Sequence, residues 1–153
     1  AAETGGLEEV VVTARKREES ARNVPVAVTA FSASTIAAAG IQQPRDFINL
    51  TPNVTLVETQ NAGNAFVTIR GISQARNSEP SVATVVDGVI ETNPASFNQE
   101  LFDIQQIEVL KGPQGALYGR NAIGGAILIT TKQPSDVLEG GLKAGWEDGP
   151  GYS

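Results

Sequence analysis

The sequence predicts an α+β domain built on a small mixed β-sheet with short flanking helices. Short β-prone runs recur along the chain, most clearly at 54–58, 66–70, 82–87 and 126–131. Segments rich in Asn, Gln, Ser, Gly and Pro separate several of these runs and are expected to be exposed loops. Strands and helices do not alternate regularly and no fixed-period repeat occurs, so a doubly wound parallel sheet is not expected.

The first strand and the helices after it have local signals. Valine recurs at every second position from Val24 to Val28, which favours a strand. Ser32 or Ser34 can cap a short helix, which Gly40 closes in a left-handed conformation. A second short helix is expected over 44–50, because the proline at its start suits the first helical turn.

The second half of the chain is expected to hold the rest of the sheet. Asp87-Gly88 predicts a tight turn between the strand at 82–87 and a partner at Val89-Ile90. Further elements are expected at 100–104 (one helical turn), 106–110 (a strand) and 113–118 (a short helix).

Composition argues against several classes of function. The chain has 153 residues and contains no Cys and no His, which removes thiol nucleophiles and the commonest metal ligand and general base. We therefore expect no enzymatic activity, no cofactor and no metal site. A net charge of −6 without a basic stripe argues against nucleic acid as a partner. No window approaches the roughly 18 consecutive apolar residues of a membrane helix.

A glycine-rich segment between two expected strands could suggest a phosphate site. Its glycines, at 112, 115, 119, 124 and 125, are not followed by Lys-Ser or Lys-Thr, as a P-loop requires. The segment also lacks the G-x-G of a dinucleotide fingerprint. We expect instead a compact turn unit, in which glycine permits sharp turns and close backbone approach.

Three motifs make the chain resemble a known family. Residues 107–132 read IEVLKGPQGALYGRNAIGGAILITTK, residues 66–72 read FVTIRGI, and residues 85–89 read VVDGV. In this order the motifs resemble the plug domain of TonB-dependent outer-membrane receptors, over roughly residues 8–135. The resemblance implies a plug-domain fold and a role as the gate in active import of a siderophore-like or other scarce nutrient.

The resemblance also implies a domain organisation. Residues 1–24 would be a flexible periplasmic arm, residues 25–135 the plug domain, and residues 136–153 the start of a β-barrel that is missing from this chain. The plug would sit in the lumen of its own 22-stranded barrel in the bacterial outer membrane, with the arm facing the periplasm. A free-standing periplasmic interaction module without a barrel is the alternative.

The N-terminal run LEEVVVTA, residues 7–14, resembles the TonB box, the segment that the energy-transducing protein TonB binds from the periplasm. An extended β-prone segment can add to the edge of a partner's sheet through main-chain hydrogen bonds, and neither Pro nor Gly interrupts this run. The residues of the box are then Glu9, Val10, Val11, Val12, Thr13 and Ala14. The alternative is an ordinary first strand of the domain.

Two basic residues at strand ends are the expected lock between plug and barrel. Arg70 precedes Gly71, and Lys111 precedes Gly112. By the resemblance, residues at these two positions face acidic residues of the barrel wall. Lys111 stands where many relatives carry Arg, and because a lysine lacks the bidentate fork the lock would be looser there. The alternative is a pair of solvated charges.

Polar loops are the expected ligand-facing part of the domain. The resemblance places 60–64, 74–80 and 92–99 at the external mouth, where they would contact a small molecule such as a ferric siderophore. The candidate residues are Asn61, Asn64, Gln74, Arg76, Asn77, Phe97 and Asn98. The alternative is plain solvated loop, and the scarcity of carboxylates and soft ligands there argues against direct metal coordination.

Overall fold

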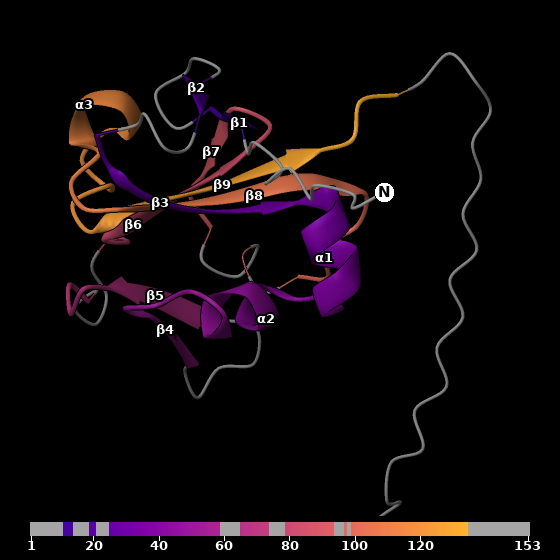
Figure 1. Cartoon of the computed structure of the whole chain (residues 1–153). Coiled ribbons are helices and arrows are strands. Elements are labelled where there is room, and N and C mark those ends of the chain that lie inside the picture. Colours follow the sequence, from indigo (N-terminus) through magenta and orange to yellow (C-terminus); the bar gives the residue numbers. More distant parts are fainter. Residues whose placement is uncertain are drawn as a thin grey trace, which may run out of the picture.

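The computed structural model describes residues 11–13, 19–20, 25–58, 65–73, 79–93, 97 and 99–134 (Figure 1). The strands are β1 (Val11–Val12), β2 (Glu19–Ser20), β3 (Ala27–Ser32), β4 (Val54–Glu58), β5 (Ala65–Ile69), β6 (Val82–Val86), β7 (Val89–Glu91), β8 (Ile104–Lys111) and β9 (Gly125–Thr131). The helices are α1 (Ala33–Ala39), α2 (Pro44–Asn49) and α3 (Gly115–Tyr118). Within the described part of the chain, none of them has the length and apolar run that a membrane-crossing helix needs.

Five strands form the main sheet, in the order β3-β8-β9-β6-β7. β8 pairs antiparallel with both β3 and β9, and β6 pairs antiparallel with β7. β6 and β9 run parallel, with Val82 opposite Gly125 and Val86 opposite Ile129, so the sheet is mixed, as the sequence predicts. β3 is an edge strand, because only β8 pairs with it in this sheet.

Both faces of the main sheet are covered (Figure 1). The helix α2 and the β4–β5 hairpin lie on one face, and the short pair β1–β2 lies over the other. Alternate residues of β8 serve the two faces: Val109 packs with Phe47 in one apolar cluster, and Leu110 packs with Val12 in the second. Coverage of both faces explains why β9 reads as a continuous apolar run rather than as an alternating one.

Three aromatic rings join the elements beneath the sheet. Phe47 of α2 has no exposed surface. Its ring lies 6.2 Å from that of Phe31 on β3 and 6.4 Å from that of Phe97, measured between centroids. Tilted and edge-to-face pairs at this spacing are favourable aromatic geometries. The three rings therefore attach α2 and the segment around residue 97 to the sheet.

The predicted helix boundaries are confirmed by their caps. The Ser32 side chain accepts a hydrogen bond from the Thr35 backbone N–H over 3.3 Å, and Gly40 ends α1 with φ +66°. Pro44 occupies the first position of α2. The two backbone N–H groups just before α2 donate to Asp46 Oδ2 over 2.9 and 2.8 Å, which anchors the start of this helix.

The Asp87-Gly88 turn is also confirmed, and it does more than join β6 to β7. The Asp87 carboxylate accepts hydrogen bonds from the backbone N–H and the hydroxyl of Thr131, each over 2.8 Å. These contacts tie the turn to the end of β9, so the VVDGV motif closes one end of the sheet.

The glycine-rich segment between β8 and β9 closes on itself, as the sequence predicts. The Gly112 N–H donates to the Gly124 carbonyl over 3.0 Å, and the Gln114 N–H donates to the Ala122 carbonyl over 2.8 Å. Helix α3 lies inside this loop. The glycines thus build a turn between two paired strands.

Two details of the sequence prediction were wrong. The strand expected from Val24 begins at Ala27, after Pro25 and Val26, and Val24 itself lies outside the described residues. The helical turn expected at 100–104 does not form, because its backbone groups bond to distant segments. The Leu101 N–H donates to the Gln42 carbonyl over 2.8 Å. Asp103 is left-handed, with φ +49°, and its carbonyl accepts from the Lys132 N–H.

Candidate functional site

The described part of the predicted TonB box is the strand β1 together with Thr13. β1 pairs antiparallel with β2, placing Val12 opposite Glu19. Val12 has no exposed surface and packs in the apolar cluster that includes Leu110 and Leu128. Val11, its neighbour, is 45% exposed. Burial of the Val12 side chain stabilises the docked strand by roughly 1.5 kcal/mol or more.

Two polar side chains of β8 contact the backbone of this strand. Gln106 Nε2 donates to the Val11 carbonyl over 2.7 Å. The Thr13 backbone N–H and hydroxyl both donate to Glu108 Oε1, over 2.8 and 2.9 Å. Gln106 Nε2 also lies 3.2 Å from Glu108 Oε1. Because residues two apart on a strand face the same side, Gln106 and Glu108 form one polar unit against the arm.

Glu108 is an unusual residue for its position. It is only 1% exposed, and its second carboxylate oxygen, Oε2, has no hydrogen-bond partner among the residues that the structure describes. Burial raises the pKa of Glu108, and the hydrogen bonds from Thr13 partly oppose this shift. Burial, followed by the negative charge of Glu108, raises the pKa of Tyr118. A buried carboxylate with one unsatisfied oxygen costs stability, and the contacts to Thr13 offset part of that cost.

The raised pKa of Glu108 predicts a pH dependence of stability that Glu108→Gln removes. Because the folded-state pKa exceeds the unfolded value, the stabilising contribution of the group is complete below the unfolded pKa and is lost as pH rises through the folded pKa. The free energy of unfolding of the wild type minus that of Glu108→Gln should therefore fall as the pH rises above the ordinary glutamate pKa of 4.5. Urea titrations at a series of pH values measure this difference, and a pH-independent difference contradicts the assignment.

The two predicted lock residues, Arg70 and Lys111, are brought together by the fold. Both line a shallow hollow of about 280 Å³ with Pro25, Gly112 and Gln114 among its other residues. Arg70 follows β5 in a left-handed conformation, with φ +52°. A Cβ on Gly112 would lie 3.4 Å from Arg70 Nη1, so the guanidinium packs close to this glycine.

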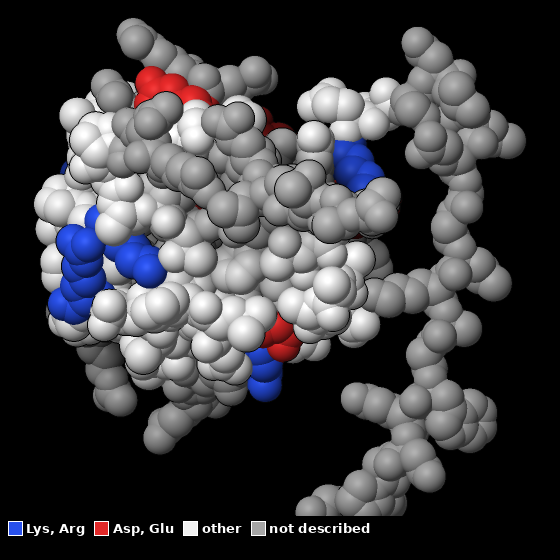
Figure 2. Space-filling model, viewed as in Figure 1, with Lys and Arg blue, Asp and Glu red and all other residues white. Residues whose placement is uncertain are grey.

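The charges in this hollow are not balanced from within the described part of the chain. Burial, followed by the charge of Arg70, lowers the pKa of Lys111. The ion pair between Arg120 and Glu79 does not involve Arg70 or Lys111. Figure 2 shows Lys and Arg side chains gathered on the side where α3 and β5 lie in Figure 1. Two neighbouring cations that meet no acidic partner among the described residues make this surface suited to binding an acidic surface.

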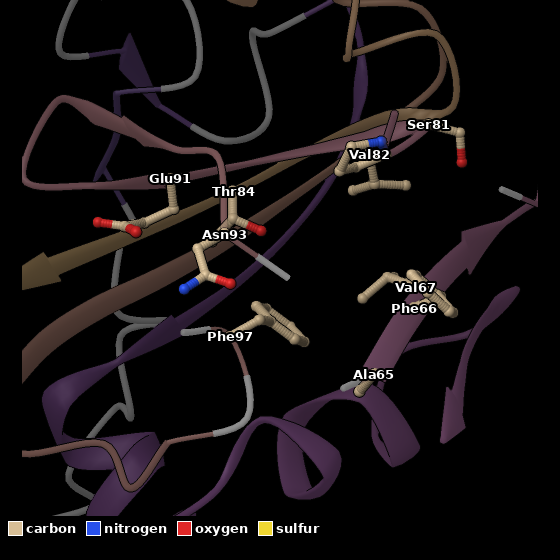
Figure 3. A pocket seen from close by; sticks show the side chains of 10 residues that line it. Ala65, Phe66, Val67, Ser81, Val82, Thr84, Glu91, Asn93 and Phe97 are labelled. Atoms are coloured by element: carbon tan, nitrogen blue, oxygen red, sulfur yellow. The ribbon is translucent and has the colours of Figure 1, made fainter. Parts of the chain in front are cut away.

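A small cavity lies between the β4–β5 hairpin and the main sheet (Figure 3). Its volume is about 30 Å³, which holds one or two water molecules and no nutrient. Phe97 lines it and is 8% exposed, with its ring packed on Phe47. The ring of Phe97 is thus part of the core, and we do not carry it forward as a ligand contact.

The other predicted site residues lie outside the described residues. For the arm these are Glu9, Val10 and Ala14; for the loops they are Asn61, Asn64, Gln74, Arg76, Asn77 and Asn98. Sequence reasoning missed Gln106 and Glu108 altogether. A signal was available for Glu108, because a carboxylate between Ile107 and Val109 interrupts an otherwise apolar strand.

Comparisons with known proteins show the family to which the chain belongs. A model of the family described as the TonB-dependent Receptor Plug Domain matches residues 20–126. The chain is 36% identical over 140 residues to the pesticin receptor of Yersinia pestis, covering 89% of this chain and 20% of that protein. It is 29% identical over 141 residues to the hemin receptor of Yersinia enterocolitica, covering 90% and 20%.

Solved structures give the same result. The ferric yersiniabactin uptake receptor FyuA from Yersinia pestis matches with a TM-score of 0.67 and 34% identity, over 73% of this chain and 18% of that chain. The ferripyoverdine receptor of Pseudomonas aeruginosa matches with a TM-score of 0.67 over 82% of this chain and 17% of that one. Its 20% identity supports a shared fold only.

The chain therefore belongs to the plug-domain family of TonB-dependent receptors. It spans about a fifth of the length of the curated relatives it matches. These relatives are receptors rather than enzymes. Arg70 and Lys111 fall inside the matched range 20–126, whereas Val11–Thr13 precede it.

Proposed function

We propose that this chain is the plug of an outer-membrane receptor that imports a scarce nutrient with energy delivered by TonB. The observation that carries the proposal is the family match over most of the chain, preceded by an extended strand. The relatives are named for pesticin, hemin and ferric yersiniabactin, and a vitamin B12 transporter of Vibrio vulnificus is 35% identical over 132 residues. A ferric siderophore is the cargo that we favour.

In this proposal TonB binds the arm by pairing with β1. A strand added to the edge of β1 gains main-chain hydrogen bonds, and those bonds share a load applied along the strand. The chain leads from β1 through β2 to β3, which is an edge strand paired only with β8. A pull on the arm therefore reaches first a strand that is held on one side only.

The cation pair is proposed to fasten the plug to the barrel. Arg70 and Lys111 share a hollow that lacks an acidic partner among the described residues. Carboxylates of a barrel wall would balance both charges, with the guanidinium able to bind one of them in a bidentate manner. Lys111 offers a single-point contact, so we expect it to contribute less than Arg70.

The ligand is proposed to bind at loops of the plug that face the external mouth of the barrel. By the family resemblance, the loops at 60–64, 74–80 and 92–99, apart from the buried Phe97, remain the proposed ligand-facing surface. The plug would lie in the barrel lumen of the bacterial outer membrane with its arm toward the periplasm.

Val11→Pro tests the TonB contact directly. Proline removes the backbone N–H of residue 11 and cannot take part fully in a β-ladder, so binding of the periplasmic domain of TonB should be abolished. Val11→Thr is the matched control, because threonine is also β-branched and keeps the N–H. A pull-down of the three chains measures the effect. Equal capture of Val11→Pro and Val11→Thr refutes the assignment of the box.

A further inference from the structure

Both edges of the arm strand are occupied in this structure. In an extended strand the N–H and C=O groups of one residue point to one edge, and those of the next residue to the other. Val11 and Thr13 therefore share an edge, and this edge is met by Gln106 Nε2 and Glu108 Oε1. The pairing with β2 takes the opposite edge. Along the described residues 11–13, a partner strand has no free edge to join.

We infer that Gln106 and Glu108 form a clamp that imitates a neighbouring strand and withholds the edge of β1 from a partner strand. The amide donor of Gln106 takes the place of a strand N–H, and the carboxylate acceptor of Glu108 takes the place of a strand C=O. Their spacing of two residues on β8 matches the spacing of Val11 and Thr13. This inference rests on the proposed function, since the partner strand is taken to be that of TonB.

The clamp is built so that it can open. Closing the clamp buries a carboxylate whose Oε2 gains no partner among the described residues. The cost of its desolvation therefore offsets part of the favourable energy of the three donated hydrogen bonds. Opening it returns the carboxylate to water. The raised pKa of Glu108 reflects the same desolvation. The hydrogen bonds of the closed clamp are short, but the desolvation of Glu108 reduces the net free energy by which they hold the arm.

Glu108→Met and Glu108→Gln together test the clamp in the 153-residue chain. Both variants remove the charge and keep the approximate shape of the side chain, but only Gln keeps an acceptor for the Thr13 N–H. Hydrogen exchange should speed up about tenfold at the Thr13 amide in Glu108→Met and much less in Glu108→Gln. At Val109 and Ile127, which are paired in the core, exchange should stay equal or slow, because a buried charge has gone.

The affinity for the periplasmic domain of TonB should be highest for Glu108→Met, lower for Glu108→Gln and lowest for the wild type. When binding requires the open arm, affinity scales with the open fraction, so it should increase by the factor by which Thr13 exchange increases. Gln106→Met, which removes the donor to Val11, should act in the same direction. Faster exchange at Val109 as well as at Thr13 would indicate general loosening and overturn the inference.

Two further outcomes would also overturn the inference that Gln106 and Glu108 form a clamp. One is unchanged Thr13 exchange in Glu108→Met, which would mean that the carboxylate does not hold the strand. The other is faster exchange with unchanged TonB affinity, which would mean that the clamp does not compete with TonB. Failure of TonB to bind any of the chains contradicts the proposed function instead, and the exchange data then decide the clamp alone.

Discussion

Gly125→Ala should prevent native folding or lower the free energy of unfolding by about 3 kcal/mol or more. Gly125 opens β9 with φ +155°, a conformation that residues with a side chain rarely adopt. A methyl group there would overlap the Leu110 carbonyl oxygen and approach Ile69 Cδ1 to 2.8 Å. The backbone cannot move aside easily, because Gly125 is paired with Lys111 on one side and with Val82 on the other.

Urea or thermal unfolding followed by circular dichroism measures this effect. Gly115→Ala is the matched control, since a Cβ at Gly115 meets nothing within 4 Å and the residue is helical. This control should be neutral or slightly stabilising, because alanine is the better helix former. A Gly125→Ala chain as stable as the control would contradict the packing described where β5, β8 and β9 meet.

Local elements were predictable where one or two residues determine the backbone. Ser32 and Gly40 delimit α1, Pro44 begins α2, and Asp87-Gly88 makes the turn from β6 to β7. Each signal acts within a few residues, so no knowledge of distant segments is needed. The turn unit of glycines was predictable for the same reason, whereas the mixed sheet was inferred from the irregular order of strands and helices along the chain.

Contacts between distant segments were not predictable from these signals. Leu101 bonds to Gln42, and this contact replaces the helical turn that local sequence favours. The contact of Glu108 with Thr13 joins residues far apart in the chain. No periodicity or spacing encodes such a pair. Arg70 and Lys111 were singled out through resemblance to the family. Their proximity in one hollow depends on the order of strands in three dimensions, which local signals do not encode.

Cysteine cross-linking in cells should place TonB at residue 11 of the whole receptor. Val11 and Val57 make a matched pair of sites, because both are exposed strand valines, at 45% and 52%. The chain has no cysteine of its own, so each substitution introduces one thiol into this domain. The periplasm is oxidising and permits disulfides to form. If β1 is the strand that TonB binds, Val11→Cys should link to TonB strongly, and Val57→Cys on β4 should not.

The most direct test of the account is therefore the yield of the TonB disulfide in cells that make TonB with one cysteine in its periplasmic domain. The account predicts a linked product with Val11→Cys, none with Val57→Cys, and a higher yield when Glu108→Met is added to Val11→Cys. Equal yields at the two sites, or no product at residue 11, would contradict the claim that this arm is the segment through which TonB acts on the plug.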